Sequence, residues 1–178
     1  LQVWKRLAAC FESMGIAPQR LEFLPRAGSY TQHLEQYRRL DIALDTYPYH
    51  GTTTTCEALF MGVPVVTLAG DRHAARVGVS LLTHAGLPEF IAGSADDYVS
   101  IAVRWSRDPA PLADLRASLR ARIEHSPLRD EAGFTARLES AMRQMWRLWC
   151  SGESPQVFEV PDPSEDPRDQ PARDKKKA

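Results

Sequence analysis

The chain has 178 residues, of which 43% are hydrophobic and 25% charged, an ordinary composition for one globular domain with a sizeable core. Its 22 lysines and arginines nearly balance its 23 acidic residues, and a formal net charge of -1 argues against nucleic acid as a partner. Cys10, Cys56 and Cys150 are an odd number without CxxC spacing, which indicates neither a disulfide framework nor a zinc site and favours the reducing cytoplasm.

The sequence contains no run of roughly 18 apolar residues, the length that spans a bilayer, and it does not begin with a signal peptide. We therefore expect no membrane as a partner. The first residues have the pattern of the middle of an amphipathic helix, so we expect the sequence to be a part of a longer protein.

Short apolar runs alternate with helical patterns through the first half of the chain. Strands are predicted over residues 21–24, 41–45, 64–68 and 89–92, and helices over residues 1–14, 29–39, 53–61 and 72–85. Such alternation predicts right-handed βαβ units and the α/β class, with a Rossmann-like parallel sheet flanked by helices.

Only helices are predicted after Ser94, over residues 96–107, 112–125 and 130–150. From residue 151 onward, five prolines and many charges leave little to bury. We expect residues 1–150 to form one lobe, and residues 151–178 to form a disordered tail.

The segment from Asp45 to Glu57 has the most informative local pattern. It follows a predicted strand and leads into a helix, and ligands of open parallel sheets bind at the carboxyl ends of strands. The first turn of a helix attracts phosphate, and Gly51 permits a close approach of the backbone to a ligand. The hydroxyls of Thr52, Thr53, Thr54 and Thr55 can donate to phosphate oxygens. These features are typical of a pyrophosphate cradle.

Structural roles are the alternatives for several of these residues. One threonine can be the N-cap of the helix, although four β-branched residues in a row are poor helix formers. Glu57 either accepts from ribose hydroxyls or complements the helix dipole. His33 either stacks on a base or lies at the surface. Arg76 either approaches the crevice at the carboxyl ends of the strands, or pairs with Asp71 and pins the loop before the helix to that helix.

Motifs for other chemistries are missing from the sequence. The histidines form no HxH or HExxH pattern, so no metal site is predicted. There is no GxSxG, Walker A or GxGxxG pattern, which leaves hydrolase, P-loop NTPase and dehydrogenase functions without their basic motifs. No cofactor is expected.

Several ordered motifs resemble the C-terminal catalytic lobe of the O-linked N-acetylglucosamine transferase and SPINDLY family, particularly its bacterial members. They lie at residues 41–46, 51–54, 59–67, 75–77, 126–128 and 145–146. The resemblance implies a GT-B fold, a UDP-sugar donor, a protein acceptor, inversion at the anomeric carbon and no metal. It also implies an N-terminal lobe and tetratricopeptide repeats elsewhere in the same polypeptide.

The resemblance also assigns residues to the donor site. His33 matches the histidine that packs against uracil, and Thr53 and Thr54 match the pair that binds the diphosphate, with Thr52 and Gly51 just before them. Glu57 matches an aspartate of the animal enzymes that binds the ribose hydroxyls. Two positions depart from the animal enzymes, which have a histidine at the position of Thr52 and a ribose-binding lysine at that of Tyr30.

The resemblance places the catalytic residues upstream of Leu1, together with a glutamine and a lysine that hold the donor phosphates. The fragment alone is therefore expected to bind a donor without turnover. UDP-N-acetylglucosamine, UDP-glucose and GDP-fucose remain as donors. A UDP-sugar epimerase of similar fold, and a non-catalytic nucleotide-sugar sensor or protein-binding scaffold, remain as alternative functions.

Overall fold

The computed structural model of the chain describes residues 2–160. The chain divides between Leu40 and Asp41 into two compact units. The prediction that residues 1–150 form a single lobe is not tested by this division and stays a prediction.

The first unit consists of short helices joined by extended segments. They are α1 (Gln2–Ser13), the 3-10 helix η1 (Pro18–Arg20), α2 (Tyr30–Gln36) and the 3-10 helix η2 (Tyr37–Arg39). Ser29 begins α2 as its N-cap, because its hydroxyl accepts a hydrogen bond from the backbone N–H of Gln32 at 3.2 Å. Gly15, at a φ of +80°, follows the end of α1.

The strand predicted over residues 21–24 is not formed within the described part of this unit. These residues are extended, but a strand requires a hydrogen-bonded neighbour, and no other strand occurs in residues 2–40. Side-chain packing holds the segment instead, since the ring of Phe23 stacks on that of Trp4 with centroids 5.7 Å apart.

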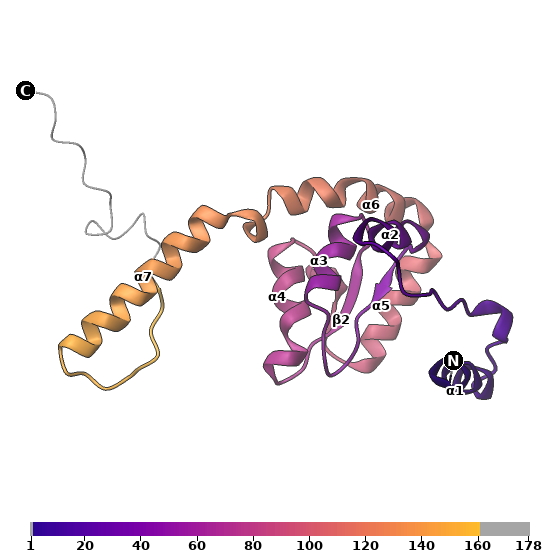
Figure 1. Cartoon of the computed structure of the whole chain (residues 1–178), viewed down its shortest axis with the longest axis horizontal. Helices are drawn as coiled ribbons and strands as arrows, with labels where there is room; N and C mark the ends of the chain where they lie inside the picture. Colours follow the sequence, from indigo (N-terminus) through magenta and orange to yellow (C-terminus); the bar gives the residue numbers. More distant parts are fainter. Residues whose placement is uncertain (1, 161–178) are drawn as a thin grey trace, which may run out of the picture. The chain divides into compact units, whose positions relative to one another are not determined.

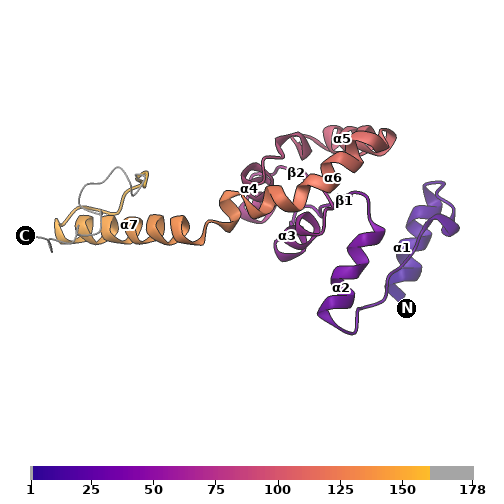
Figure 2. The ribbon, with the colours of Figure 1, turned by 90° about the horizontal axis from the view of Figure 1, so that it is seen from above.

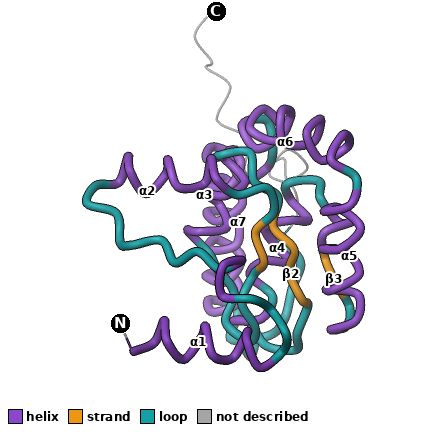
Figure 3. The backbone as a smooth tube through the Cα atoms, turned by 90° about the vertical axis from the view of Figure 1, so that its right-hand side faces the viewer, coloured by secondary structure: helices purple, strands orange, loops and turns teal. Residues whose placement is uncertain are grey.

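The second unit is built on a parallel sheet, which confirms the predicted α/β class. Strands β1 (Ala43–Leu44), β2 (Val65–Leu68) and β3 (Ile91–Ala92) lie in the order β1-β2-β3. Ala43 is in register with Val65, and Thr67 with Ile91. The central strand β2 is buried from Val65 to Thr67, as expected for an apolar run covered on both faces. Figure 3 shows β2 and β3 side by side, with a helix next to β3.

Helices flank this sheet. Between the strands lie α3 (Thr53–Phe60), the 3-10 helix η3 (His73–Ala75), α4 (Val77–His84) and the 3-10 helix η4 (Pro88–Phe90). After β3 follow α5 (Ala95–Arg107), α6 (Pro109–Glu124), the 3-10 helix η5 (Pro127–Arg129) and α7 (Glu131–Cys150). Helices α4 and α5 both contact β2, which lies between them in Figure 1. Helix α6 contacts α3 and α5 (Figure 2).

The helix predicted over residues 72–85 is interrupted, and the cause lies outside it. The backbone leaves helical geometry at Arg76, with φ -130° and ψ -3°. The carbonyl of Ala74 accepts the backbone N–H of His50 at 2.9 Å, and the carbonyl of Ala75 accepts that of Gly70 at 2.9 Å. Because loop residues occupy these carbonyls, η3 and α4 are separate helices.

The hydrophobic core of the second unit is formed largely by side chains of its helices. Its largest fully buried side chains are Phe90, Leu59, Leu82, Leu87 and Leu119. The ring of Phe90 stacks on that of Trp105 with centroids 4.8 Å apart. Helix α3 is joined to α6 by the guanidinium of Arg120, which lies 4.1 Å from the ring centroid of Phe60.

Helix α7 exposes a stripe of apolar side chains along its length. Phe134, Leu138, Met145 and Trp149 are all exposed, and Ser140 is the buried residue of the helix. Residues 151–160 form no helix or strand. The predicted disorder of residues 151–178 stays a prediction, and residues 161–178 lie outside the described part. No helix among residues 2–160 is both long and apolar enough to cross a membrane.

Candidate functional site

The loop that joins β1 to α3 lies at the carboxyl edge of the sheet. Asp45 follows β1 directly, and its N–H continues the ladder to the carbonyl of Val66 at 2.9 Å. Thr52 precedes α3, whose first backbone bond runs from the N–H of Cys56 to the carbonyl of Thr52 at 3.1 Å. The predicted placement of this segment, at a strand end and a helix start, is confirmed.

The threonine run divides into exposed and buried members. Thr52 occupies the N-cap position of α3, but its side chain makes no capping hydrogen bond. Thr52, Thr53 and Thr54 are exposed. Thr55 is buried and donates its hydroxyl to the carbonyl of Gly51 at 3.0 Å. The exposed threonines therefore stand at the positive end of the α3 dipole, where an anion is favoured.

Gly51 has a packing role beneath these threonines. A Cβ at this position would lie 2.6 Å from Thr54 Oγ1 and 2.8 Å from Thr55 Oγ1, closer than side chains approach. The N–H of Gly51 donates to Asp45 Oδ1 at 2.8 Å. Because this N–H is already bonded, a phosphate would meet the N–H groups that follow it. The predicted contact of Gly51 with a ligand stays a prediction.

A buried polar cluster lies under the loop, formed by Asp45, His50, Thr67 and Gly78. Thr67 Oγ1 donates to Asp45 Oδ2 at 2.8 Å and lies 3.2 Å from His50 Nδ1. The N–H of Gly78 donates to His50 Nδ1 at 3.1 Å, and His50 Nε2 lies 3.0 Å from the carbonyl oxygen of Leu68. The cluster therefore joins the ends of β1 and β2 to the first turn of α4.

Sequence reasoning did not find this cluster. It considered His50 only as a metal ligand, and it treated Thr67 as part of an apolar strand. The available signal was a polar residue within a buried run, because buried polar groups require hydrogen-bond partners. The partners lie 22 and 17 residues from Thr67 in sequence, and no local pattern identifies them.

The Asp45–His50 pair is not arranged as a general base. His50 Nδ1 accepts from Gly78 and therefore carries no proton, so Nε2 is protonated and donates to the carbonyl of Leu68. The residue is only 2% exposed. An imidazole with both nitrogens bonded inside the protein does not reach a substrate proton, so the cluster is structural.

Tyr98 of α5, outside the loop, forms a hydrogen bond to the cluster. Its hydroxyl donates to the carbonyl of Asp45 at 2.8 Å. Burial, and to a lesser extent the negative charge of Asp45, raises the pKa of the Tyr98 phenol, so the phenol remains protonated and keeps this hydrogen bond.

The other residues that are predicted to bind the nucleotide-sugar donor lie in different units. Glu57 is half-buried on α3, in the second unit. His33 is half-buried on α2, in the first unit, and its ring packs edge-on to Tyr37 at 5.5 Å and tilted against Tyr30 at 6.3 Å. The ribose and uracil contacts assigned to Glu57 and His33 stay predictions.

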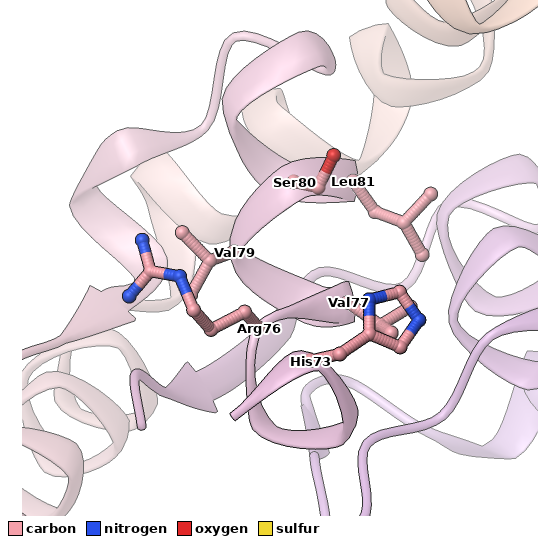
Figure 4. Close-up of a pocket in the computed structure, with 6 residues that line it drawn as sticks. All are labelled: His73, Arg76, Val77, Val79, Ser80 and Leu81. Carbon is pink, nitrogen blue, oxygen red and sulfur yellow. The ribbon is translucent and has the colours of Figure 1, made fainter. Parts of the chain in front are cut away.

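Arg76 holds the loop before η3, but through Gly70 and not through Asp71. Its Nη1 donates to the carbonyl of Gly70 at 3.1 Å, which pins the loop before η3, although Asp71 lies nearer to Arg72, at 3.9 Å. Arg76 also lines a pocket of about 440 Å³ together with His73 and Ser80, to which no residue from Asp45 to Glu57 contributes. An approach of Arg76 to the crevice at the strand ends stays a prediction. Figure 4 shows the side chains of Arg76 and His73 extending to opposite sides of the start of α4.

No group of three or more histidine, cysteine or acidic side chains within residues 2–160 is arranged to hold a metal ion. The independence from metals that the sequence predicts is an expectation about the reaction, and it stays a prediction.

Cys56, between the threonines and Glu57, offers a chemical probe of the site. All three cysteines are free and exposed. The thiol of Cys56 is nevertheless partly buried, and this burial raises its pKa. Since the thiolate is the reactive form, we expect iodoacetamide at about pH 8 to modify Cys56 at least about threefold more slowly than Cys10 or Cys150. Peptide mass spectrometry over time measures the three rates, with urea-unfolded protein as the control. A fastest reaction at Cys56 would contradict this expectation.

Comparisons with known proteins identify the family. The family model described as glycosyl transferase family 41 matches residues 4–138. A Petunia hybrida protein named as a probable UDP-N-acetylglucosamine–peptide N-acetylglucosaminyltransferase SPINDLY is 46% identical over 155 residues, which are 87% of this chain and 17% of that protein. A Caenorhabditis elegans UDP-N-acetylglucosamine–peptide N-acetylglucosaminyltransferase is 34% identical over 138 residues, 78% of this chain and 12% of the relative.

A solved structure agrees with these relatives. A mutant of the Thermobaculum terrenum O-GlcNAc transferase superposes with a TM-score of 0.77 at 44% identity, and the match covers 84% of this chain and 28% of that one. The chain thus spans a small part of each relative. The fold, the ordered motifs and the match over more than half of its length show that the chain belongs to glycosyl transferase family 41.

Proposed function

We propose that the full-length protein containing this chain transfers N-acetylglucosamine from UDP-N-acetylglucosamine to serine or threonine hydroxyls of proteins, with inversion and without a metal. In this proposal the chain supplies the nucleotide-sugar-binding part, and the protein acts in the cytoplasm. The names of the relatives support the donor and the acceptor class. The observation that carries the proposal is the exposed trio Thr52, Thr53 and Thr54 at the start of α3.

The trio suits the leaving group of such a reaction. When the acceptor hydroxyl attacks the anomeric carbon, negative charge grows on the departing UDP. Fixed hydroxyl and N–H donors at a helix N-terminus stabilise that charge without taking part in proton transfer. His33 would contact the uracil and Glu57 the ribose.

The catalytic base and the cationic partner of the donor phosphates belong, in this proposal, to other parts of the full-length protein. This chain covers 17% of the Petunia hybrida relative, so the relatives have ample further sequence for a second lobe and for tetratricopeptide repeats that recruit the acceptor. His50 does not serve as the base, because both of its ring nitrogens are bonded inside the fold.

Titration calorimetry of the full-length protein tests the donor. We expect UDP and UDP-N-acetylglucosamine to bind with a Kd of about 1 to 100 μM, corresponding to about 5 to 8 kcal/mol, and binding to be unchanged by EDTA. If only GDP and GDP-fucose bind, the donor is GDP-fucose and not UDP-N-acetylglucosamine. Binding of neither nucleotide would overturn the proposal.

Product analysis tests the reaction. Incubation with UDP-N-acetylglucosamine and a serine-containing peptide is expected to increase the peptide mass by one N-acetylhexosamine. Binding without transfer, in protein that has both lobes, would favour a nucleotide-sugar sensor or scaffold. Conversion of the free UDP-sugar to its epimer would favour an epimerase.

A further inference from the structure

We infer that Asp45 and His50 are positioning residues for the diphosphate subsite: they fix the loop from Asp45 to Gly51, and thereby set the place of Thr52, Thr53 and Thr54. This inference rests on the proposed function, because it concerns the same subsite. It adds two residues that would touch no part of the donor.

Two hydrogen bonds of His50 replace one hydrogen bond that an uninterrupted helix would make. In an uninterrupted helix through residues 72–85, the carbonyl of Ala74 would accept the N–H of Gly78, four residues on. Instead, the N–H of His50 donates to the Ala74 carbonyl at 2.9 Å, and the ring Nδ1 of His50 accepts from Gly78 at 3.1 Å. His50 is thus inserted between η3 and α4 by its backbone and its side chain together, which fixes the last residue before Gly51.

Asp45 fixes the other end of the loop and its junction with α3. Its side chain is 3% exposed. One carboxylate oxygen accepts the N–H of Gly51 at 2.8 Å, and the other accepts the hydroxyl of Thr67 at 2.8 Å. Since Gly51 in turn accepts the hydroxyl of Thr55 at 3.0 Å, the bonds run without a gap from β2 to the first turn of α3.

The exposed threonines depend on this support for their geometry. Donors that are ordered before a ligand arrives do not lose conformational freedom when it binds, and a misplacement of about 1 Å costs about 100-fold in rate. A negative charge on Asp45 would repel a diphosphate, so a favourable effect of this residue on binding would come from its hydrogen bonds and not from its charge. This distinction makes the role testable.

Paired variants of the full-length protein separate hydrogen bonding from charge. Asp45→Asn keeps an acceptor for Gly51 and can donate to Thr67, so we expect its Kd for UDP to stay within about threefold of the wild-type value. Asp45→Ala removes both bonds and is expected to weaken UDP binding at least about tenfold. An equal loss in both variants would overturn the positioning role, because it would indicate a role of the charge.

The same comparison applies to His50 and provides the test if Asp45→Ala does not fold. His50→Asn places an amide oxygen near the position of Nδ1 and is expected to keep binding within about threefold, whereas His50→Ala is expected to weaken it at least about tenfold. In each Ala variant, KM for the acceptor peptide is expected to change less than about twofold. Amide hydrogen exchange of residues 51–57 is expected to become faster.

A control variant separates positioning from lost stability. Ser126 is also buried, and its hydroxyl donates to the Ile123 carbonyl at 2.8 Å and accepts from Leu128 at 3.3 Å. Ser126→Ala is expected to lower stability without changing the Kd for UDP. If Asp45→Ala and His50→Ala bind UDP as the wild type does, while Thr53→Val binds weakly, the inference is wrong and the proposed function stands. If the wild type binds neither UDP nor GDP, the proposed function itself is wrong.

Discussion

Gly78→Ala is expected to lower the free energy of unfolding by about 2 to 3 kcal/mol, although alanine is the better helix former. Propensity alone predicts a gain of up to about 1 kcal/mol in the first turn of α4. Sterics predict the opposite, because a Cβ would lie 2.5 Å from Thr67 Oγ1, 2.6 Å from Asp45 Oδ2 and 3.0 Å from His50 Nδ1. These buried groups are held by hydrogen bonds and cannot move away freely, so overpacking outweighs the gain.

Thermal unfolding of the full-length protein measures this effect. The Tm of the transition in which the second unit unfolds is expected to fall by several degrees. Gly93→Ala is the matched control, since its Cβ would meet only Asp97 Oδ2, at an ordinary 3.6 Å, and its expected effect is within about 0.5 kcal/mol. A Gly78→Ala variant as stable as the wild type would show that the cluster of Asp45, His50, Thr67 and Gly78 adapts, and would remove the basis for treating it as rigid.

Local patterns in the sequence predicted most of the second unit. The apolar run before Ala69 predicted the buried central strand, because strand burial on two faces has a direct signature. Helices α5 and α7 begin within a residue of their predicted starts, because Ser94 and Asp130 cap them in sequence and in structure. Local propensity and tertiary packing agree in these elements.

The failed predictions depend on contacts between distant residues. Residues 21–24 have the pattern of a strand but no strand partner within residues 2–40. The pattern of residues 72–85 is helical throughout, yet His50 interrupts it from 28 residues before Gly78. Periodicity reports which face of a segment is apolar, and it contains no information about which other segment will occupy its carbonyls.

The candidate site was predicted in position but not in its support. Sequence reasoning left capping and phosphate binding open for the threonine run, and the missing side-chain cap at Thr52 excludes capping by that residue. It did not separate buried Thr55 from its exposed neighbours, because alternation of exposure within a helix start depends on the packing beneath it. The residues that hold the loop became visible only through their hydrogen bonds.

The double variant Thr53→Val, Thr54→Val is expected to reduce kcat/KM for transfer by about 100-fold or more in the full-length protein. A hydrogen bond to a charged group contributes about 1.5 to 3 kcal/mol, and two such bonds to the diphosphate would be lost together. Valine keeps the β-branched shape and the helix propensity of threonine, so the hydroxyls are the only groups removed. Because negative charge increases on the departing UDP, part of the loss is expected in kcat and not only in KM.

Thr83→Val provides the matched control for this double variant. Thr83 is also an exposed helical threonine, on α4, and its hydroxyl donates to the carbonyl of Val79 at 2.8 Å. Its replacement is expected to leave kcat/KM within about twofold, since Thr83 lies in the last turn of α4 and not at the start of α3. A double variant with wild-type kcat and donor affinity would show that the diphosphate binds elsewhere. A loss confined to KM would assign the two threonines to ground-state binding, and would assign the stabilisation of the leaving group to residues other than these two.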